Sequence, residues 1–282
     1  MFDMIEGSKF IACENDKESA DIIIFGVPFD GTTSFRPGTR FGPMAIRTDS
    51  YGIETYSAYQ DLDLTEKKVA DIGDLELPFG NTRRVLKKIN EVSKSVLKLD
   101  KKPLMLGGEH LVTLGLVEEL VKIYPDLCII HFDAHTDLRE DYLGEKLSHA
   151  SVIKRIWDIV GDNKIYQFGI RSGTKEEFEF AKIHTVLNKF NANNIKEIAS
   201  QLKGKQIYLT IDLDVLDPSI FSGTGTPEPG GMSFNEFLES LLCLKGLDFV
   251  GADIVELSPH YDQSSVSTAV ACKIVREVLL ML

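Results

Sequence analysis

Eight short apolar runs alternate with segments of helical periodicity along almost the whole 282-residue chain, and this alternation constrains the fold most strongly. Several runs, such as IIIFGV and LCIIHF, are apolar at nearly every position, which is typical of strands covered on both faces of a parallel sheet. The predicted strands are Asp21–Val27, Val69–Ile72, Pro103–Leu106, Leu127–Phe132, Lys164–Gly169, Thr185–Leu187, Gln206–Ile211 and Phe249–Val255. The pattern predicts an α/β fold.

Amphipathic segments fill the intervals between the apolar runs. In residues 82–99, for example, Val85, Ile89 and Val92 fall on one helical face. The predicted helices are Thr82–Leu99, Leu111–Ile123, Ala150–Val160, Lys175–Ile183, Asn194–Leu202, Ser233–Leu244 and Ser265–Leu280. Ser233 and Glu236 have the spacing of a capping box, which predicts a helix start.

The alternation runs on without an internal repeat or linker, so a single domain is predicted over residues 1–282. Periodicity leaves two architectures open, because an open three-layer sandwich and a closed eight-stranded barrel both alternate strands with helices. Both place functional groups at the carboxyl ends of the strands. Long loops follow three of the predicted strands, at residues 29–43, 136–148 and 217–232, and we expect the site there.

Charge and composition exclude several classes of protein. The net charge is −12 and Lys and Arg do not cluster, so no nucleic-acid partner is expected. No apolar run reaches the roughly 18 residues that cross a membrane, so no membrane partner is expected either. The four cysteines are far apart, and the first residues do not resemble a signal peptide. We therefore expect reduced thiols and a cytoplasmic protein.

Two acidic motifs come directly after apolar runs. DAHTD spaces Asp133, His135 and Asp137 by two residues, so an extended backbone would direct the three side chains to one face. DLD places Asp212 and Asp214 after a second run. Carboxylates that share a buried face repel one another unless a cation or a proton compensates. The two motifs therefore predict a cation site at the edge of the sheet.

The motif GGEH adds His110 to this set, because its glycines permit a tight turn at the end of a strand. Four aspartates and two histidines, without cysteine, favour Mn²⁺ over Fe²⁺, Co²⁺ or Zn²⁺. Two divalent ions would balance four carboxylates, as in dinuclear centres that produce a nucleophile from water near pH 7. His131 lies deeper in its strand, and we expect it to be hydrogen-bonded in the core.

Two further titratable residues are candidates for catalysis. Glu256 ends the last predicted strand and would face the same edge as the metal ligands, although a helix cap or an ion pair would equally place a glutamate there. His149 precedes a predicted helix, where it could cap that helix. Because the pKa of histidine is near 7, His149 is also a candidate proton carrier.

Taken together, GGEH, DAHTD and DLDVLDPS resemble the ureohydrolases, a family that includes arginase, agmatinase, guanidinobutyrase and formiminoglutamase. The resemblance covers nearly the whole chain, and residues 26–47, 223–231 and 255–262 are most similar to the agmatinase branch. It implies a three-layer α/β/α sandwich with an eight-stranded parallel sheet. It also implies two Mn²⁺ ions per chain and assembly as a homotrimer or homohexamer.

The resemblance also implies a role for each site residue. Four side chains would hold each ion, and two aspartates would bridge the pair. The ligands of the first ion would be His110, Asp133, Asp137 and Asp212, and those of the second His135, Asp133, Asp212 and Asp214.

The remaining roles concern a small cationic guanidino substrate. Glu256 would bind the guanidinium group and His149 would carry protons to and from water. Asp137 would pass a proton to the leaving nitrogen, which leaves more readily when protonated. The expected reaction converts agmatine to urea and putrescine.

Several activities besides agmatine hydrolysis fit parts of the same pattern. A guanidinobutyrase or guanidinopropionase would need a cation for the substrate's carboxylate, and Arg139 is the candidate. The loop after DAHTD lacks the Asn-rich stretch of arginases, and its acids Glu140, Asp141 and Glu145 would favour a cationic tail. The remaining candidates are a formiminoglutamase, a metal-dependent deacetylase with one zinc ion and a non-catalytic metal-binding protein.

Overall fold

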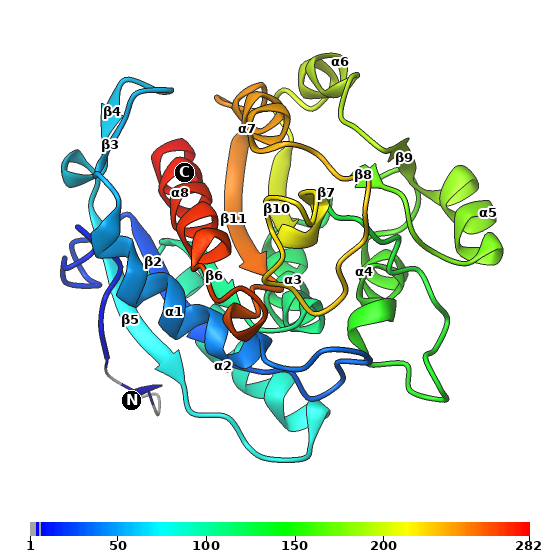
Figure 1. Cartoon of the computed structure of the whole chain (residues 1–282), viewed down its shortest axis with the longest axis horizontal. Coiled ribbons are helices and arrows are strands. Elements are labelled where there is room, and N and C mark those ends of the chain that lie inside the picture. The colour runs from blue at the N-terminus through cyan, green and yellow to red at the C-terminus, as the bar shows by residue number, and fades with distance from the viewer. Residues whose placement is uncertain (1–3, 6) are drawn as a thin grey trace.

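The structure, a computed structural model, describes residues 4–5 and 7–282, which build a nine-stranded sheet between two layers of helices (Figure 1). The strand order is β1-β5-β2-β6-β11-β10-β7-β8-β9, with β1 and β9 at opposite edges. The strands are β1 (Met4–Ile5), β2 (Ile22–Val27), β5 (Val69–Leu75), β6 (Lys102–Gly107), β7 (Cys128–Phe132), β8 (Ile165–Ile170), β9 (Val186–Lys189), β10 (Gln206–Asp212) and β11 (Asp248–Val255). The sheet is therefore open, and the closed barrel is excluded.

All eight predicted strands are present and pair in parallel. The ninth strand, β1, pairs antiparallel with β5 and was not predicted, because two residues are too few to show a pattern. A small hairpin of β3 (Tyr56–Ser57) and β4 (Leu62–Asp63) was not predicted either. The prediction of a three-layer sandwich is confirmed, with one strand more in the sheet than expected.

The helices cover both faces of the sheet and create two cores. One layer contains α1 (Gly42–Asp49), α6 (Ile195–Gln201), α7 (Phe234–Leu242) and α8 (Val266–Met281). The other contains α2 (Thr82–Lys98), α3 (Thr113–Ile123), α4 (Val152–Val160) and α5 (Lys175–His184). Along β2, Ile22 and Ile24 pack into the first core, and Ile23 and Phe25 pack into the second. None of the described helices is both long and apolar enough to cross a membrane.

A row of four buried polar side chains crosses the middle of the sheet. The backbone register pairs Asp253 on β11 with Thr210 on β10, Thr210 with His131 on β7, and His131 with Gln167 on β8. Thr210 Oγ1 donates to Asp253 Oδ1 at 2.7 Å, and Gln167 Nε2 donates to His131 Nδ1 at 3.2 Å. His131 and Thr210 of this polar row lie two residues before the strand-end acids Asp133 and Asp212. The row is therefore placed to hold these acids in position.

Candidate active site

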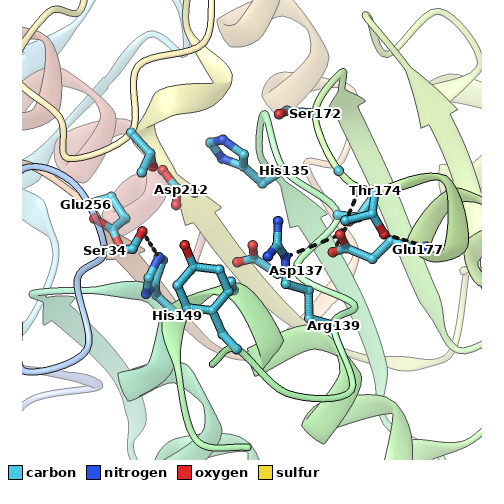
Figure 2. A pocket seen from close by; sticks show the side chains of 15 residues that line it. Ser34, His135, Asp137, Arg139, His149, Ser172, Thr174, Glu177, Asp212 and Glu256 are labelled. Atoms are coloured by element: carbon cyan, nitrogen blue, oxygen red, sulfur yellow. Dashed lines mark hydrogen bonds and ion pairs between the residues drawn. The ribbon is translucent and has the colours of Figure 1, made fainter. Parts of the chain in front are cut away.

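The six predicted metal ligands meet at the carboxyl edge of the sheet. Figure 2 shows three of them, His135, Asp137 and Asp212. His110 begins the short helix η4 (His110–Val112), just after β6. Its Nδ1 atom lies 3.1 Å from Asp133 Oδ2, 3.2 Å from Asp137 Oδ2 and 3.4 Å from Asp212 Oδ2. One histidine nitrogen and three carboxylate oxygens thus surround one point.

His135 and Asp214 form a second group beside the first. His135 Nδ1 lies 3.0 Å from Asp214 Oδ2 and 3.4 Å from Asp133 Oδ1. Asp133 therefore turns one oxygen towards each histidine and lies between the two groups. Asp212 turns Oδ2 towards His110, while its Oδ1 accepts a hydrogen bond from the Asp214 backbone N–H at 2.9 Å.

The polar row determines which nitrogen of His110 carries the proton. Thr210 Oγ1 donates to Asp253, so it accepts from His110 Nε2–H, 2.9 Å away. His110 Nδ1 is buried, has no hydrogen-bond partner and faces three carboxylate oxygens. Burial opposes protonation of the ring, but the three carboxylates raise the pKa of His110 well above its usual range, so this position attracts a cation, either a proton or a metal ion. The donor set therefore fits a divalent metal ion.

His131 has the hydrogen-bonded core position predicted for it. Because Gln167 donates to Nδ1, the His131 Nε2–H donates to Asp133 Oδ2 at 2.8 Å. Burial lowers the pKa of His131, so the ring is neutral and orients a predicted metal ligand. The other two histidines, His184 and His260, do not line the pocket; the first pairs with Asp162 and the second is exposed.

The charges of the site are poorly compensated by protein groups alone. Burial and the nearby Asp133 carboxylate raise the pKa of Asp137 to about 7. Burial and the carboxylates of Asp214 and Asp133 raise the pKa of Asp212 well above its usual range. Burial opposes ionisation of Asp133 too, but the three neighbouring histidines hold its pKa well below the usual range. Divalent cations are the compensation that such a cluster accommodates.

Two of the predicted catalytic residues have positive φ angles, which residues other than glycine rarely adopt. Asp137 has a φ angle of 52° and Glu256 one of 67°. The Glu256 backbone N–H bonds the Gly108 carbonyl at 2.9 Å, and its Oε1 accepts from the His110 backbone N–H at 2.8 Å. Backbone strain of this kind is concentrated at functional sites, where the surrounding structure holds it.

A pocket of about 270 Å³ opens above these residues. Its lining includes Glu256, Asp212, Asp137, His135 and His149, and Figure 2 shows Glu256 and Glu177 on opposite sides of it. His149 Nε2 lies 3.0 Å from Ser34 Oγ, and burial lowers the pKa of this ring to about 4. His149 is therefore neutral near pH 7, and its burial opposes protonation of the ring.

Sequence reasoning missed Glu177, a buried carboxylate in the pocket wall. Its Oε1 accepts from Thr136 Oγ1 at 2.7 Å and from the Leu138 N–H at 3.2 Å, so it holds both neighbours of Asp137. Its Oε2 accepts from the Thr174 N–H at 2.7 Å. The spacing of Thr174 and Glu177 in the sequence, which is that of a capping box, was the available signal.

The loop after DAHTD contributes Arg139 to the pocket wall and not the acidic residues that were expected there. Arg139 lines the pocket and pairs with Glu177 at 3.4 Å, whereas the loop acids Glu140, Asp141 and Glu145 lie outside the lining. Glu140 instead forms ion pairs with Lys146 and Lys154. Besides the metal ligands and Glu256, the carboxylate in the pocket wall is therefore Glu177, whose charge is paired with Arg139.

Comparisons with known proteins agree with this geometry. The model of the Arginase family matches residues 20–281. An agmatinase from Bacillus cereus is 49% identical over 278 residues, which cover 97% of this chain and 96% of that protein. A Clostridium difficile protein of known crystal structure superposes with a TM-score of 0.92 at 55% identity, covering 94% of this chain and 98% of that one.

A second solved structure, the agmatine ureohydrolase of Thermoplasma volcanium, superposes with a TM-score of 0.88 at 33% identity. It covers 98% of this chain and 94% of its own. The family model and these relatives each extend over nearly the whole chain. The chain therefore belongs to the arginase family.

Proposed function

We propose that this protein hydrolyses agmatine to urea and putrescine. The observation that carries the proposal is the near-complete, 49% identical match to an agmatinase, in a chain whose six candidate metal ligands lie together and contribute His135, Asp137 and Asp212 to the wall of one pocket. The arginase family implies a binuclear metal site, and the His/Asp cluster lies where such a site is expected.

Mn²⁺ is the metal that we propose, because carboxylates and imidazoles without thiolates are its preferred ligands. His110, Asp133, Asp137 and Asp212 would hold one ion, and His135, Asp133, Asp212 and Asp214 the other. Such ions lower the pKa of water, so that a nucleophile is available near pH 7. His110 Nδ1 supports a cation at this position, since it is buried among three carboxylate oxygens and has no hydrogen-bond partner.

Glu256 would bind and orient the guanidinium group. Its carboxylate lines the pocket and is fixed by the His110 N–H at Oε1, which leaves Oε2 to accept from the substrate. A planar cation against a buried carboxylate forms charge-assisted hydrogen bonds, which are about twice as strong as neutral ones. These bonds would hold the guanidinium carbon over the metal ligands.

Asp137 and His149 would move protons. We assign to Asp137 Oδ1 the uptake of a proton and its release to the leaving nitrogen, because Oδ2 faces His110. His149, neutral and bonded through Nε2 to the exposed Ser34 hydroxyl, would exchange protons with solvent. The two side chains line the same pocket.

The distal amine of agmatine would extend towards Glu177, on the other side of the pocket from Glu256. Urea release by the Mn²⁺-loaded protein, measured with agmatine, guanidinobutyrate, guanidinopropionate and arginine, tests the proposal. We expect the highest kcat/KM with agmatine. A preference for arginine or for a guanidino acid would contradict it and would point to Arg139 as a carboxylate ligand.

Three broader proposals accompany this function. A homotrimer or homohexamer rests on the resemblance to the family, and light scattering at micromolar concentration tests it. A single domain over residues 1–282 is supported by one sheet that includes strands from both ends of the chain. A cytoplasmic location is supported by the four free cysteines, which suit a reducing compartment.

A further inference from the structure

The loop after β2 contacts His149 at two points. The His149 backbone N–H donates to Thr32 Oγ1 at 3.1 Å, and the ring nitrogen Nε2 lies 3.0 Å from Ser34 Oγ. Both threonine and serine belong to the segment Gly31–Ser34, which is more than a hundred residues from His149 in the sequence. The position and the orientation of the ring therefore depend on where this segment lies.

The segment is in turn anchored by Glu109, a fully buried carboxylate that no step of the proposed reaction uses. Glu109 Oε2 accepts from the Thr32 backbone N–H at 2.7 Å, and Oε1 accepts from the Thr32 hydroxyl. The Glu109 N–H bonds the Phe29 carbonyl at 2.7 Å. At Gly108, a Cβ atom would lie 2.0 Å from that same carbonyl oxygen, so only glycine lets the segment approach this closely.

The Thr32 hydroxyl is the point where these contacts join. Because it donates to Glu109, it accepts from the His149 N–H, and both of its roles are defined. We propose that Thr32, anchored by Glu109, is a positioning residue that sets the place of His149 for proton transfer. This inference rests on the proposed function, since it assigns His149 a proton to carry.

The test removes one hydroxyl from the loop at a time. Thr32→Val keeps the shape of the side chain and loses its hydroxyl, while Thr32→Ser keeps the hydroxyl. Thr33→Val is the matched control, because the Thr33 hydroxyl reaches Glu109 only at 3.5 Å and does not contact His149 among the described bonds. Steady-state urea release from agmatine is measured with the Mn²⁺-loaded proteins, together with their metal content.

We expect Thr32→Val to lower kcat at least tenfold with KM within twofold of wild type and with unchanged metal content. Thr32→Ser and Thr33→Val should stay within threefold of wild type. Added imidazole should raise kcat of Thr32→Val more than that of wild type, since a free base can replace a misplaced one. An unchanged kcat in Thr32→Val, an equal loss in Thr32→Ser, or loss of metal in Thr32→Val overturns the inference.

A second readout does not depend on activity. In metal-free protein labelled with ¹⁵N-histidine, we expect the ring resonances of His149 to shift in Thr32→Val and to stay in place in Thr33→Val. If wild type releases no urea from any of the four substrates, the proposed function fails, and this measurement alone decides the positioning role. Unchanged His149 resonances in Thr32→Val would then overturn it.

Discussion

At the scale of single residues, the site depends on hydrogen bonds whose direction is defined. Asp253 is an acceptor for Tyr208 and Thr210, so Thr210 has only its lone pairs left for His110. These bonds hold Nε2 of His110 against Thr210 and leave Nδ1 facing the candidate metal position. Asp253, two hydrogen bonds away, thereby orients a predicted metal ligand.

Replacing Thr210 with valine tests this dependence. The change leaves His110 Nε2–H and one oxygen of Asp253 without their partner in a buried place. We expect Mn²⁺ affinity, measured by calorimetric titration of metal-free protein, to fall about 10- to 100-fold. Thr210→Ser, which keeps the hydroxyl, is the matched control. Equal affinity in the valine variant and wild type would contradict the dependence.

Glu256→Gln separates substrate binding from metal binding. The glutamine keeps an oxygen for the His110 N–H, so both metals should remain. Losing the charge should cost about 2–4 kcal/mol of transition-state stabilisation, or on the order of 30- to 1000-fold in kcat/KM. Glu145→Gln makes the same change on an exposed loop and should have no effect. Wild-type turnover in Glu256→Gln would show that the assigned role is wrong.

At the scale of elements, the sequence predicts those helices and strands that are long enough to show a hydrophobic period. The eight parallel strands and seven helices are apolar runs or amphipathic segments, and all are present. β1, the β3–β4 hairpin and α1 were missed because two-residue strands have no period and the eight residues of α1 follow a Gly- and Pro-rich loop.

The same limit applies to the site. The six candidate ligands were predictable because motifs at strand ends bring them to one edge of the sheet. The contacts of Glu109 with Thr32, and of Glu177 with Thr136, join segments 77 and 41 residues apart. No local pattern in the sequence reports such pairs, since they depend on which loops meet above the sheet.

The start of α7 allows a prediction at this scale. Ser233 and Glu236 form the predicted capping box, in which each side chain bonds the other's backbone N–H. Ser233→Ala should lower the free energy of unfolding by about 1 kcal/mol, because one donor at the helix end loses its acceptor. The melting temperature should fall by about 2–4 °C. Ser200→Ala, within α6, should cause no such fall. Activity should be unchanged in both.

At the scale of the whole molecule, the candidate metal site connects the central strands of the sheet. Its ligands lie at the end of β10 or shortly after β6, β7 and β10, and Glu256 follows β11, so four adjacent strands converge on one point. The buried carboxylates repel one another there. Cations that bind only the folded chain should therefore stabilise the whole fold and not one loop.

Metal removal measures this coupling. At a free Mn²⁺ concentration of 100 times its Kd, each ion should add about 2.7 kcal/mol to the free energy of unfolding. We expect the melting temperature, followed by calorimetry, to rise by about 5 °C or more over protein in chelator. Ca²⁺, which prefers oxygen ligands, should raise it less. Metal analysis after dialysis should approach two ions per chain, and a plateau at one would contradict the binuclear site.

The order of strands in the sheet has a consequence for how the chain is made. β11, which is synthesised after the other described strands, lies between β6 and β10 and is the only described strand that joins them. A nascent chain of 247 residues already contains every candidate ligand, the last being Asp214, yet His110 belongs to one unjoined part of the sheet and Asp133 and Asp212 to the other. Synthesis of β11 therefore separates a chain that contains the ligands from a chain in which the site is assembled.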